Sequence, residues 1–178
     1  ARTITIIFTA TDDCGNASTT SATFTINDTT APSITTAASN ASSECQGTTP
    51  NSNTDYVAWL AAHGGAAASD LCGNNVTWSD NTGTAAWGGT PCARTITIIF
   101  TATDDCGNAS TTSATFTIND TTAPAITTAA SNASSECQGT TPNSNTDYVA
   151  WLAAHGGAVA SDLCGNNVTW SDNTGTAA

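Results

Sequence analysis

Residues 93–120 read ARTITIIFTATDDCGNASTTSATFTIND and decide the fold class. In residues 94–103 Thr alternates with Ile, Phe or Ala, and residues 111–118 continue the alternation through Ala114, Phe116 and Ile118. This alternation, rich in β-branched side chains, predicts half-buried β-strands. The Asp, Cys, Gly and Asn between the two segments predict a turn. The stretch therefore predicts a long β-hairpin that ends a domain.

The same stretch opens the chain, because the sequence repeats with a period of 92 residues. Residues 1–86 and residues 93–178 differ only at Ser33/Ala125 and Ala67/Val159. A period of this length is about the size of one small domain, so each copy is expected to carry its own core. The sequence therefore predicts an array of domains.

The linker is expected at Asn27–Pro32 and at its repeat, Asn119–Pro124, because Pro restricts the preceding residue and cannot donate to a β-ladder. One complete repeat then covers residues 31–122. Residues 1–30 are the C-terminal strands of a preceding repeat, and residues 123–178 are the N-terminal part of a following repeat. Two full periods would add only a copy of the hexapeptide 87–92. We therefore expect either a window cut from a longer polymer or subunits that complete each other by exchanging strands.

The rest of the repeat has shorter elements. Residues 76–79 and the stretch around Ile34 predict short strands. Residues 54–63 predict one helix, which Ser52 or Asn53 caps, in which Val57, Leu60 and Ala61 form the apolar stripe, and which Gly64-Gly65 ends. The second copy repeats this helix at 146–155. The fold class is therefore predicted as all-β, an antiparallel β-sandwich with one short inserted helix per repeat.

Composition excludes two classes of partner. The chain has 14 acidic and 2 basic residues and a net charge of −12, so it offers almost no cations to the phosphates of a nucleic acid. Its longest strongly apolar run, residues 98–100, is far too short to span a membrane. With 39% hydrophobic residues and only 9% charged ones, the chain is nevertheless apolar enough to fold.

The turn Ala102–Asn108 (ATDDCGN), the Thr-rich strand after it and the exit Asn119–Pro124 (NDTTAP) resemble the HYR-like, immunoglobulin-like tandem repeats of bacterial surface adhesins and extracellular fibre proteins. The resemblance covers the whole chain. It implies tandem immunoglobulin-like sandwiches, an extracellular or cell-surface location, and a stalk or fibre role without enzymatic activity. The helix at residues 56–63 departs from the plainest members of that family.

Each repeat contains four cysteines: Cys45, Cys72, Cys92 and Cys106. Their spacing lacks the C-x-x-C pairs of zinc sites, and an even number in a small acidic repeat indicates disulfides formed in an oxidising compartment. The immunoglobulin-like path favours Cys72–Cys106 and Cys45–Cys92, with the other two pairings left open. Cys14 and Cys164 hold the places of Cys106 and Cys72 and are expected to pair between successive units. Buried free thiols are the alternative.

The acidic residues gather in the linker and in loops expected at one end of the domain. Clustered carboxylates without cations are costly unless they are solvated or share an ion, and Ca²⁺ accepts several such oxygen ligands. The sequence thus suggests a calcium site, for which the candidate ligands are Asp28, Asp70, Asp104, Asp105 and Asp120. The alternative is that these residues only form turns.

Sequons suggest attached glycans. Trp59, Trp78 and Trp87 are expected in the core, with stacking on sugars as the alternative. Glycans are possible at Asn16, Asn27, Asn40, Asn75 and Thr29. No G-x-S-x-G motif accompanies the histidines, so we expect no enzyme. The sequence favours a structural repeat of an extracellular fibre or adhesin stalk whose partner is itself. A carbohydrate- or surface-binding adhesin module is the alternative.

Overall fold

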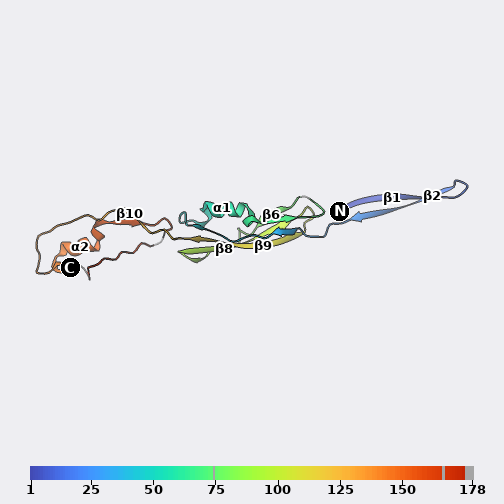
Figure 1. The fold of residues 1–178 in the computed structure, drawn as a ribbon. Helices are drawn as coiled ribbons and strands as arrows, with labels where there is room; N and C mark the ends of the chain where they lie inside the picture. The colour runs from blue at the N-terminus through green and yellow to red at the C-terminus, as the bar shows by residue number, and fades with distance from the viewer. Residues whose placement is uncertain (74, 166, 175–178) are drawn as a thin grey trace. The chain divides into compact units, whose positions relative to one another are not determined.

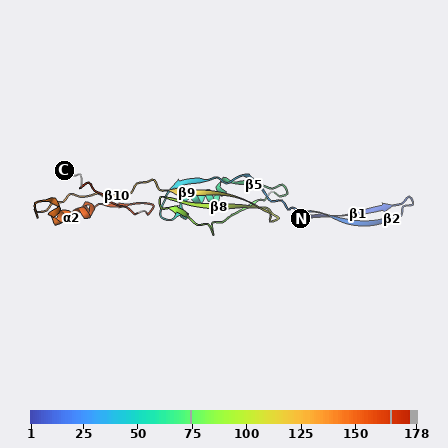
Figure 2. The same ribbon diagram turned by 90° about the horizontal axis from the view of Figure 1, so that it is seen from below.

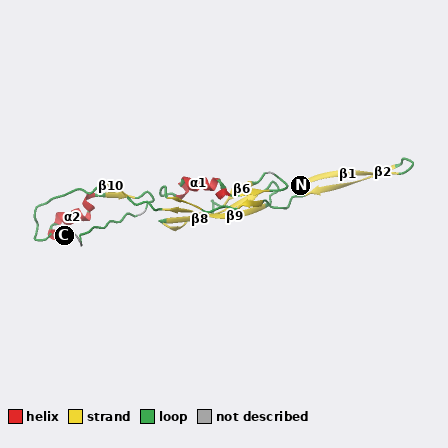
Figure 3. Cartoon of the chain, viewed as in Figure 1, coloured by secondary structure: helices red, strands yellow, loops and turns green. Residues whose placement is uncertain are grey.

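The computed structural model describes residues 1–73, 75–165 and 167–174, so residues 175–178 of the expected third segment lie outside it. The described chain is predominantly β (Figures 1 and 3). Its contacts divide it into two compact units. Unit 1 comprises residues 1–40, 61–85 and 97–115, and unit 2 comprises residues 41–60, 86–96 and 116–178. These units cut across the expected 31–122 repeat, whose boundaries stay a prediction.

Unit 1 opens with the predicted type of hairpin. Strands β1 (Arg2–Thr11) and β2 (Ala17–Ile26) pair antiparallel over their full length, as two views show (Figures 1 and 2). Strand β3 (Ser33–Thr36) pairs antiparallel with β5 (Ala67–Ser69). Strand β6 (Thr77–Asp80) pairs antiparallel with β8 (Ala93–Thr103).

Unit 2 holds most of both helices. Helix α1 (Thr54–Ala61) and helix α2 (Thr146–Ala153) follow the short 3-10 turns η1 (Pro50–Ser52) and η3 (Pro142–Ser144). Strand β10 (Ala125–Thr128) pairs antiparallel with β11 (Val159–Ser161). Two further 3-10 turns follow the helices, η2 (His63–Gly65) in unit 1 and η4 (His155–Gly157) in unit 2. None of the helices in the described part of the chain has the length and apolar character to cross a bilayer.

The largest sheet has the order β4-β9-β8-β6, with β7 (Gly88–Thr90) also paired to β8. Strand β4 (Ala41–Glu44) pairs with β9 (Ala109–Asn119) in parallel, so the expectation of a purely antiparallel architecture is wrong. The chain can pair these strands in parallel because no hairpin joins them: α1 and strands β5 to β8 lie between them in the sequence. The sheet is therefore mixed, and a two-layer immunoglobulin-like sandwich stays a prediction.

The predicted strand pattern explains the buried side chains. Alternate positions of the two long strands are buried, namely Ile96, Ile98, Phe100 and Ala102 on β8 and Ala114, Phe116 and Ile118 on β9. Because successive side chains of a strand point to opposite faces, this alternation places one apolar face of each strand in the core. The strand prediction for this hairpin is confirmed.

The helix prediction is confirmed at its N-terminal cap, but α1 ends at Ala61, before the expected residue 63, and its buried face differs from the prediction. Asn53 Oδ1 accepts hydrogen bonds from the backbone N–H groups of Asp55 (3.1 Å) and Tyr56 (3.0 Å), which makes Asn53 the cap. The chain reverses at Gly64, whose φ of 65° suits a residue without a Cβ. The expected stripe through Val57 is wrong, because Val57 is half exposed and Tyr56 is the buried residue of α1. The Tyr56 ring packs on Phe116 and Trp87, so aromatic contacts select the face.

Candidate metal centre and cysteine junction

Three of the five predicted calcium ligands lie together. Asp28 follows β2, Asp70 follows β5 and Asp104 follows β8, and one carboxylate oxygen from each lies within 4.8 Å of the others. Asp104 is buried, and the other two are half-buried. Asn108 Nδ2 also donates to the backbone carbonyl of Asp28 at 3.4 Å. The sequence prediction that the linker acid and two loop acids meet at one place in the fold agrees with this geometry.

Each of the three carboxylates also shapes its own turn. Asp104 Oδ1 accepts from the backbone N–H groups of Cys106 (2.8 Å) and Asn108 (2.9 Å), and its Oδ2 accepts from Asn108 Nδ2 (2.8 Å). Burial acts to raise the pKa of Asp104, but these hydrogen bonds outweigh it and lower the pKa below its usual value. Asp70 Oδ1 accepts from the N–H groups of Cys72 and Gly73, at 2.8 and 3.1 Å. The turn-forming role is therefore present whether or not the oxygens share an ion.

The other two candidate ligands are not part of this group of three. Asp105 is exposed, and its Oδ2 accepts from Asn75 Nδ2 at 3.5 Å. Asp120 belongs to a second group with Asp162 and Cys164. The sulfur of Cys164 is bonded to another cysteine, so this group offers two carboxylates and no thiolate. Oxygen ligands of the first group fit a hard divalent cation, and calcium there stays a prediction.

The disulfide in the structure joins the two copies of the repeat. Cys45, directly after β4, is bonded to Cys164, shortly after β11, with their Cα atoms 5.9 Å apart. The cysteine spacing did not predict this pairing. The remaining cysteines are exposed thiols: Cys14, Cys72, Cys92, Cys106 and Cys137. The favoured pairs Cys72–Cys106 and Cys45–Cys92, and the expected pairing of Cys14 with Cys164, are therefore not those of the structure.

The sheet explains why Cys45 does not pair with Cys92. The backbone N–H of Cys45 donates to the carbonyl of Asn119 at 2.7 Å, and the N–H of Asp120 donates to the carbonyl of Cys92 at 3.0 Å. The end of β9 thus lies between the two cysteines. Two strand spacings separate the backbones on either side of a strand by about 9.5 Å. A disulfide rarely joins Cα atoms more than about 7 Å apart.

Cys72 and Cys106 do lie at one end of the fold, as expected, but as thiols. Both line a cavity of about 780 Å³ whose other walls are Ala1, Arg2, Ile26, Asp28, Leu71, Gly73, Asn75, Asp104 and Asp105. The negative charge of Asp28, followed by partial burial and the charge of Asp70, raises the pKa of Cys72. The thiol form of Cys72 is therefore favoured over the thiolate at neutral pH.

The sequence did not predict one contact with the linker 119–124, which we call the linker clamp: the hydrogen bonds between Glu44 and two threonines. Glu44 accepts hydrogen bonds from Thr121 N (2.8 Å), Thr121 Oγ1 (2.8 Å) and Thr122 Oγ1 (3.0 Å). The bond from the Thr121 backbone, with its hydroxyl next in order, lowers the pKa of Glu44. No local sequence pattern links a glutamate to threonines this far along the chain. Only the parallel β4–β9 pairing brings them together.

The candidate glycan acceptors and the tryptophans lie in different surroundings. The candidate glycan acceptors Asn16, Asn27, Asn40, Asn75 and Thr29 are all exposed, and glycans there stay a prediction. The tryptophans instead pack within the fold: Trp59 lies 5.3 Å from Phe116 and Trp78 lies 5.0 Å from His63 between ring centroids. Both residues are half-buried, and His63 contributes an aromatic surface to Trp78.

A scan of the chain against protein-family models matched no family, and a search of curated proteins returned no match.

Proposed function

We propose that the chain is a structural repeat of an extracellular or cell-surface fibre, without enzymatic activity, whose partner is another copy of itself. The observation that carries this proposal is the Cys45–Cys164 disulfide. It bonds one copy of the repeat to the next, in addition to the peptide linker between them. Redundant covalent connection between consecutive repeats suits a protein that bears tension, and it requires an oxidising compartment.

The proposal includes a finer description of the fold. Each 92-residue repeat is an immunoglobulin-like sandwich with one inserted helix, arranged in tandem. The buried alternate positions of β8 and β9 support this description. So does the recurrence of the same helix in both copies as α1 and α2.

Electron microscopy of the purified chain tests the proposal. Under oxidising conditions at high protein concentration, we expect filaments or linear oligomers whose mass is a multiple of 17.8 kDa. The comparison sample is the same protein with reductant, in which the oligomers are expected to be shorter. A particle of one chain at all concentrations, by microscopy and by light scattering, would contradict the fibre.

A glycan array separates the fibre from the carbohydrate-binding module. Selective binding of a sugar by a dispersed chain would favour that alternative. The half-buried, packed state of Trp59 and Trp78 favours the fibre, because these rings already have protein partners.

A further inference from the structure

The β1–β2 and β8–β9 hairpins have the same sequence but opposite burial. Phe116 of β9 is 1% exposed, whereas its counterpart Phe24 of β2 is 66% exposed. The contrast extends along both strands: Ile96, Ile98, Phe100 and Ile118 are buried, while Ile4, Ile6, Phe8 and Ile26 are exposed. A continuous exposed apolar face of this kind marks a surface that binds another protein surface.

The exposed hairpin keeps the local structure of the buried one. Its threonine pair Thr5–Thr23 has an Oγ1–Oγ1 distance of 2.9 Å, against 2.8 Å for Thr97–Thr115. In its turn Asp12 Oδ1 accepts from the N–H groups of Cys14 and Asn16, the bonds that Asp104 makes in the other hairpin. Since β1–β2 is already formed, little further ordering opposes its binding.

The second copy of the repeat lacks the strands that a hairpin would pair with. Residues 133–136 (ASSE) and 169–172 (TWSD) have the sequences of β4 and β6, yet they are not strands. In the first copy β4 pairs with β9 and β6 pairs with β8. The pairs β3–β5 and β10–β11, which involve no hairpin, form alike in both copies. Because these two segments have the same sequences in both copies, we attribute the difference to their surroundings: β8–β9 pairs with the first copy, and no hairpin pairs with the second among the described residues.

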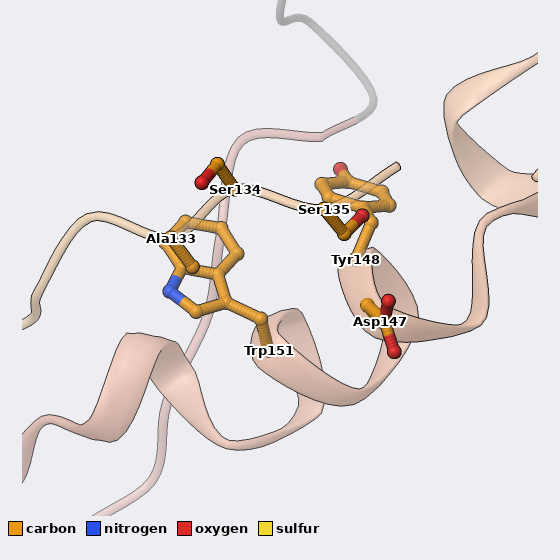
Figure 4. A pocket seen from close by; sticks show the side chains of 6 residues that line it. All are labelled: Ala133, Ser134, Ser135, Asp147, Tyr148 and Trp151. Carbon is orange, nitrogen blue, oxygen red and sulfur yellow. The ribbon is translucent and has the colours of Figure 1, made fainter. Parts of the chain in front are cut away.

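The second copy also has a cavity in place of a phenylalanine. In the first copy the ring of Phe116 lies 5.4 Å from Tyr56 and 5.3 Å from Trp59. The counterparts Tyr148 and Trp151 line a cavity of about 260 Å³ with Ala133, Ser134, Ser135 and Asp147 (Figure 4).

A second cavity lies beside His155, the counterpart of His63. In the first copy the ring centroids of Phe100 and His63 lie 6.2 Å apart. In the second copy His155 and Trp170 line a cavity of about 340 Å³, which shares Tyr148 and Trp151 with the first cavity. The second copy therefore has room for two phenylalanines of a hairpin.

We propose that the β1–β2 hairpin of one chain inserts into residues 125–172 of a second chain and completes it as β8–β9 completes the first copy. This inference rests on the proposed fibre function and names its contact surface. The register follows from that of the first copy: Ala133 of one chain faces Phe24 of the other, and Trp170 faces Ala10. Phe24 then fills the cavity beside Tyr148 and Trp151, and Phe8 fills the one beside His155.

The linker clamp and the disulfide repeat across the same contact. Glu136, the counterpart of Glu44, receives Thr29 and Thr30 of the other chain in the way Glu44 receives Thr121 and Thr122. The Cys45–Cys164 bond has its counterpart in Cys137 of the acceptor chain and Cys72 of the donor chain. Both are exposed thiols in the single chain, and Cys72 borders the 780 Å³ cavity in which the Cys137 loop is then seated.

Formation of this bond requires an oxidant of the disulfide class, such as oxidised glutathione. The thiolate of one cysteine attacks the oxidant and forms a mixed disulfide, and the second cysteine then displaces glutathione from it. One sulfur–sulfur bond forms between Cys137 and Cys72, and the bond in the oxidant breaks. The two protons and two electrons that the cysteines lose appear in two molecules of reduced glutathione.

Alanine variants of the full chain test the hairpin surface under reducing conditions. Phe24→Ala and Phe8→Ala are each expected to weaken association about 100- to 1000-fold in sedimentation velocity. Ile7→Ala is the matched control on the other face of the hairpin. Ile7 is 68% exposed, but its counterpart Ile99 stays 43% exposed in the completed copy, so Ile7→Ala should associate like the parent chain.

Cysteine variants test the bond after oxidation with glutathione. The parent chain should give a ladder of covalent oligomers on a non-reducing gel. Cys72→Ser alone and Cys137→Ser alone should each lose it, while an equimolar mixture of the two should give covalent dimers. Cys106→Ser is the matched control, because Cys106 lines the same cavity and the ladder should survive its removal. Peptide mass spectrometry should identify the Cys72–Cys137 link.

The outcomes separate this inference from the function on which it rests. Association that tolerates Phe24→Ala as well as Ile7→Ala, or covalent oligomers linked through other cysteines, would overturn the inserted hairpin and leave the fibre standing. A parent chain that stays single under reducing and oxidising conditions would overturn both.

Discussion

Asp104 fixes the turn between β8 and β9 through hydrogen bonds that only its ionised form accepts fully. Its pKa is lowered in the folded chain, so ionised Asp104 stabilises the fold at pH values above its unfolded pKa of about 3.9. That stability is lost as the pH falls below this value toward the folded pKa. The sequence predicted that aspartates such as Asp104 form turns. The structure shows the reason, because the carboxylate of Asp104 accepts hydrogen bonds from backbone N–H groups of its turn.

Asp104→Asn should therefore lower the melting temperature at pH 7 and reduce the loss of stability on acidification. The neutral amide accepts weaker hydrogen bonds from Cys106 and Asn108 and has no charge to lose. Thermal melts between pH 2.5 and pH 7 measure both effects. Asp13→Asn, at the exposed tip of the β1–β2 hairpin, is the control and should follow the parent chain.

Calcium gives a second prediction for the same carboxylates. If Asp28, Asp70 and Asp104 share an ion, calcium at 100 times its dissociation constant should add about 2.7 kcal/mol to the free energy of unfolding. A chelator should reverse the gain and expose the linker near Thr29 to proteases.

The calcium test has its own matched variants. Asp70→Asn should abolish the response to calcium, while Asp105→Asn, outside the cluster, should retain it. Melting curves that are the same with calcium and with chelator would leave only the turn-forming role.

Among the elements, the helices show which structural features can be predicted from neighbouring residues in the sequence. The cap at Asn53 was predictable, because a side-chain acceptor before an apolar stretch satisfies free N–H groups of the first turn. The buried face was not, because the position of Tyr56 depends on Phe116, which lies 60 residues away in the sequence. Local periodicity also gave β8 and β9, whose buried faces alternate regularly.

Strand β4 could not be predicted from its local sequence. Its sequence ASSE has no strand pattern, and the same letters at 133–136 form no strand where no hairpin is present. The Cys45–Cys164 bond was missed for the same reason, since its two partners are 119 residues apart and meet only through the parallel pairing. The three acids of the first cluster were predictable as a group, because each follows a strand that ends at the same place.

Asn53→Ala should cost about 1 to 2 kcal/mol in the free energy of unfolding. Asn53 is buried, caps α1, and donates through Nδ2 to the carbonyl of Glu44 at 3.0 Å. The control is Asn145→Ala, which removes the same bonds from a half-buried copy and should cost less in the single chain. Urea denaturation followed by tryptophan fluorescence measures both, and equal losses would contradict the role of burial.

On the scale of the whole molecule, charge opposes assembly. Each chain has a net charge of −12, so bringing chains together costs electrostatic energy that salt reduces. Raising sodium chloride from 10 to 150 mM should therefore strengthen association, because the screening length falls from about 30 to about 8 Å. Light scattering at fixed protein concentration measures this, and weaker association at the higher salt concentration would show that attractive ion pairs dominate the contact.

The linker from Asn27 to Pro32 has six residues, and its length limits which repeat the β1–β2 hairpin can complete. Asp28 lies beside Asp104 and Asn108 at the turn end of β9, whereas a hairpin completing the same copy must leave Asn27 at the other end, where Asn119 is. The 11 residues of β9 span about 35 Å, but six linker residues reach at most about 21 Å. The β1–β2 hairpin therefore cannot complete the first copy of the repeat, which directly follows it in the same chain. In the proposed assembly the hairpin of each chain enters the second copy of another chain, so we expect head-to-tail growth and a polar filament. A chain without residues 1–30 should then stop growth at one of the two filament ends.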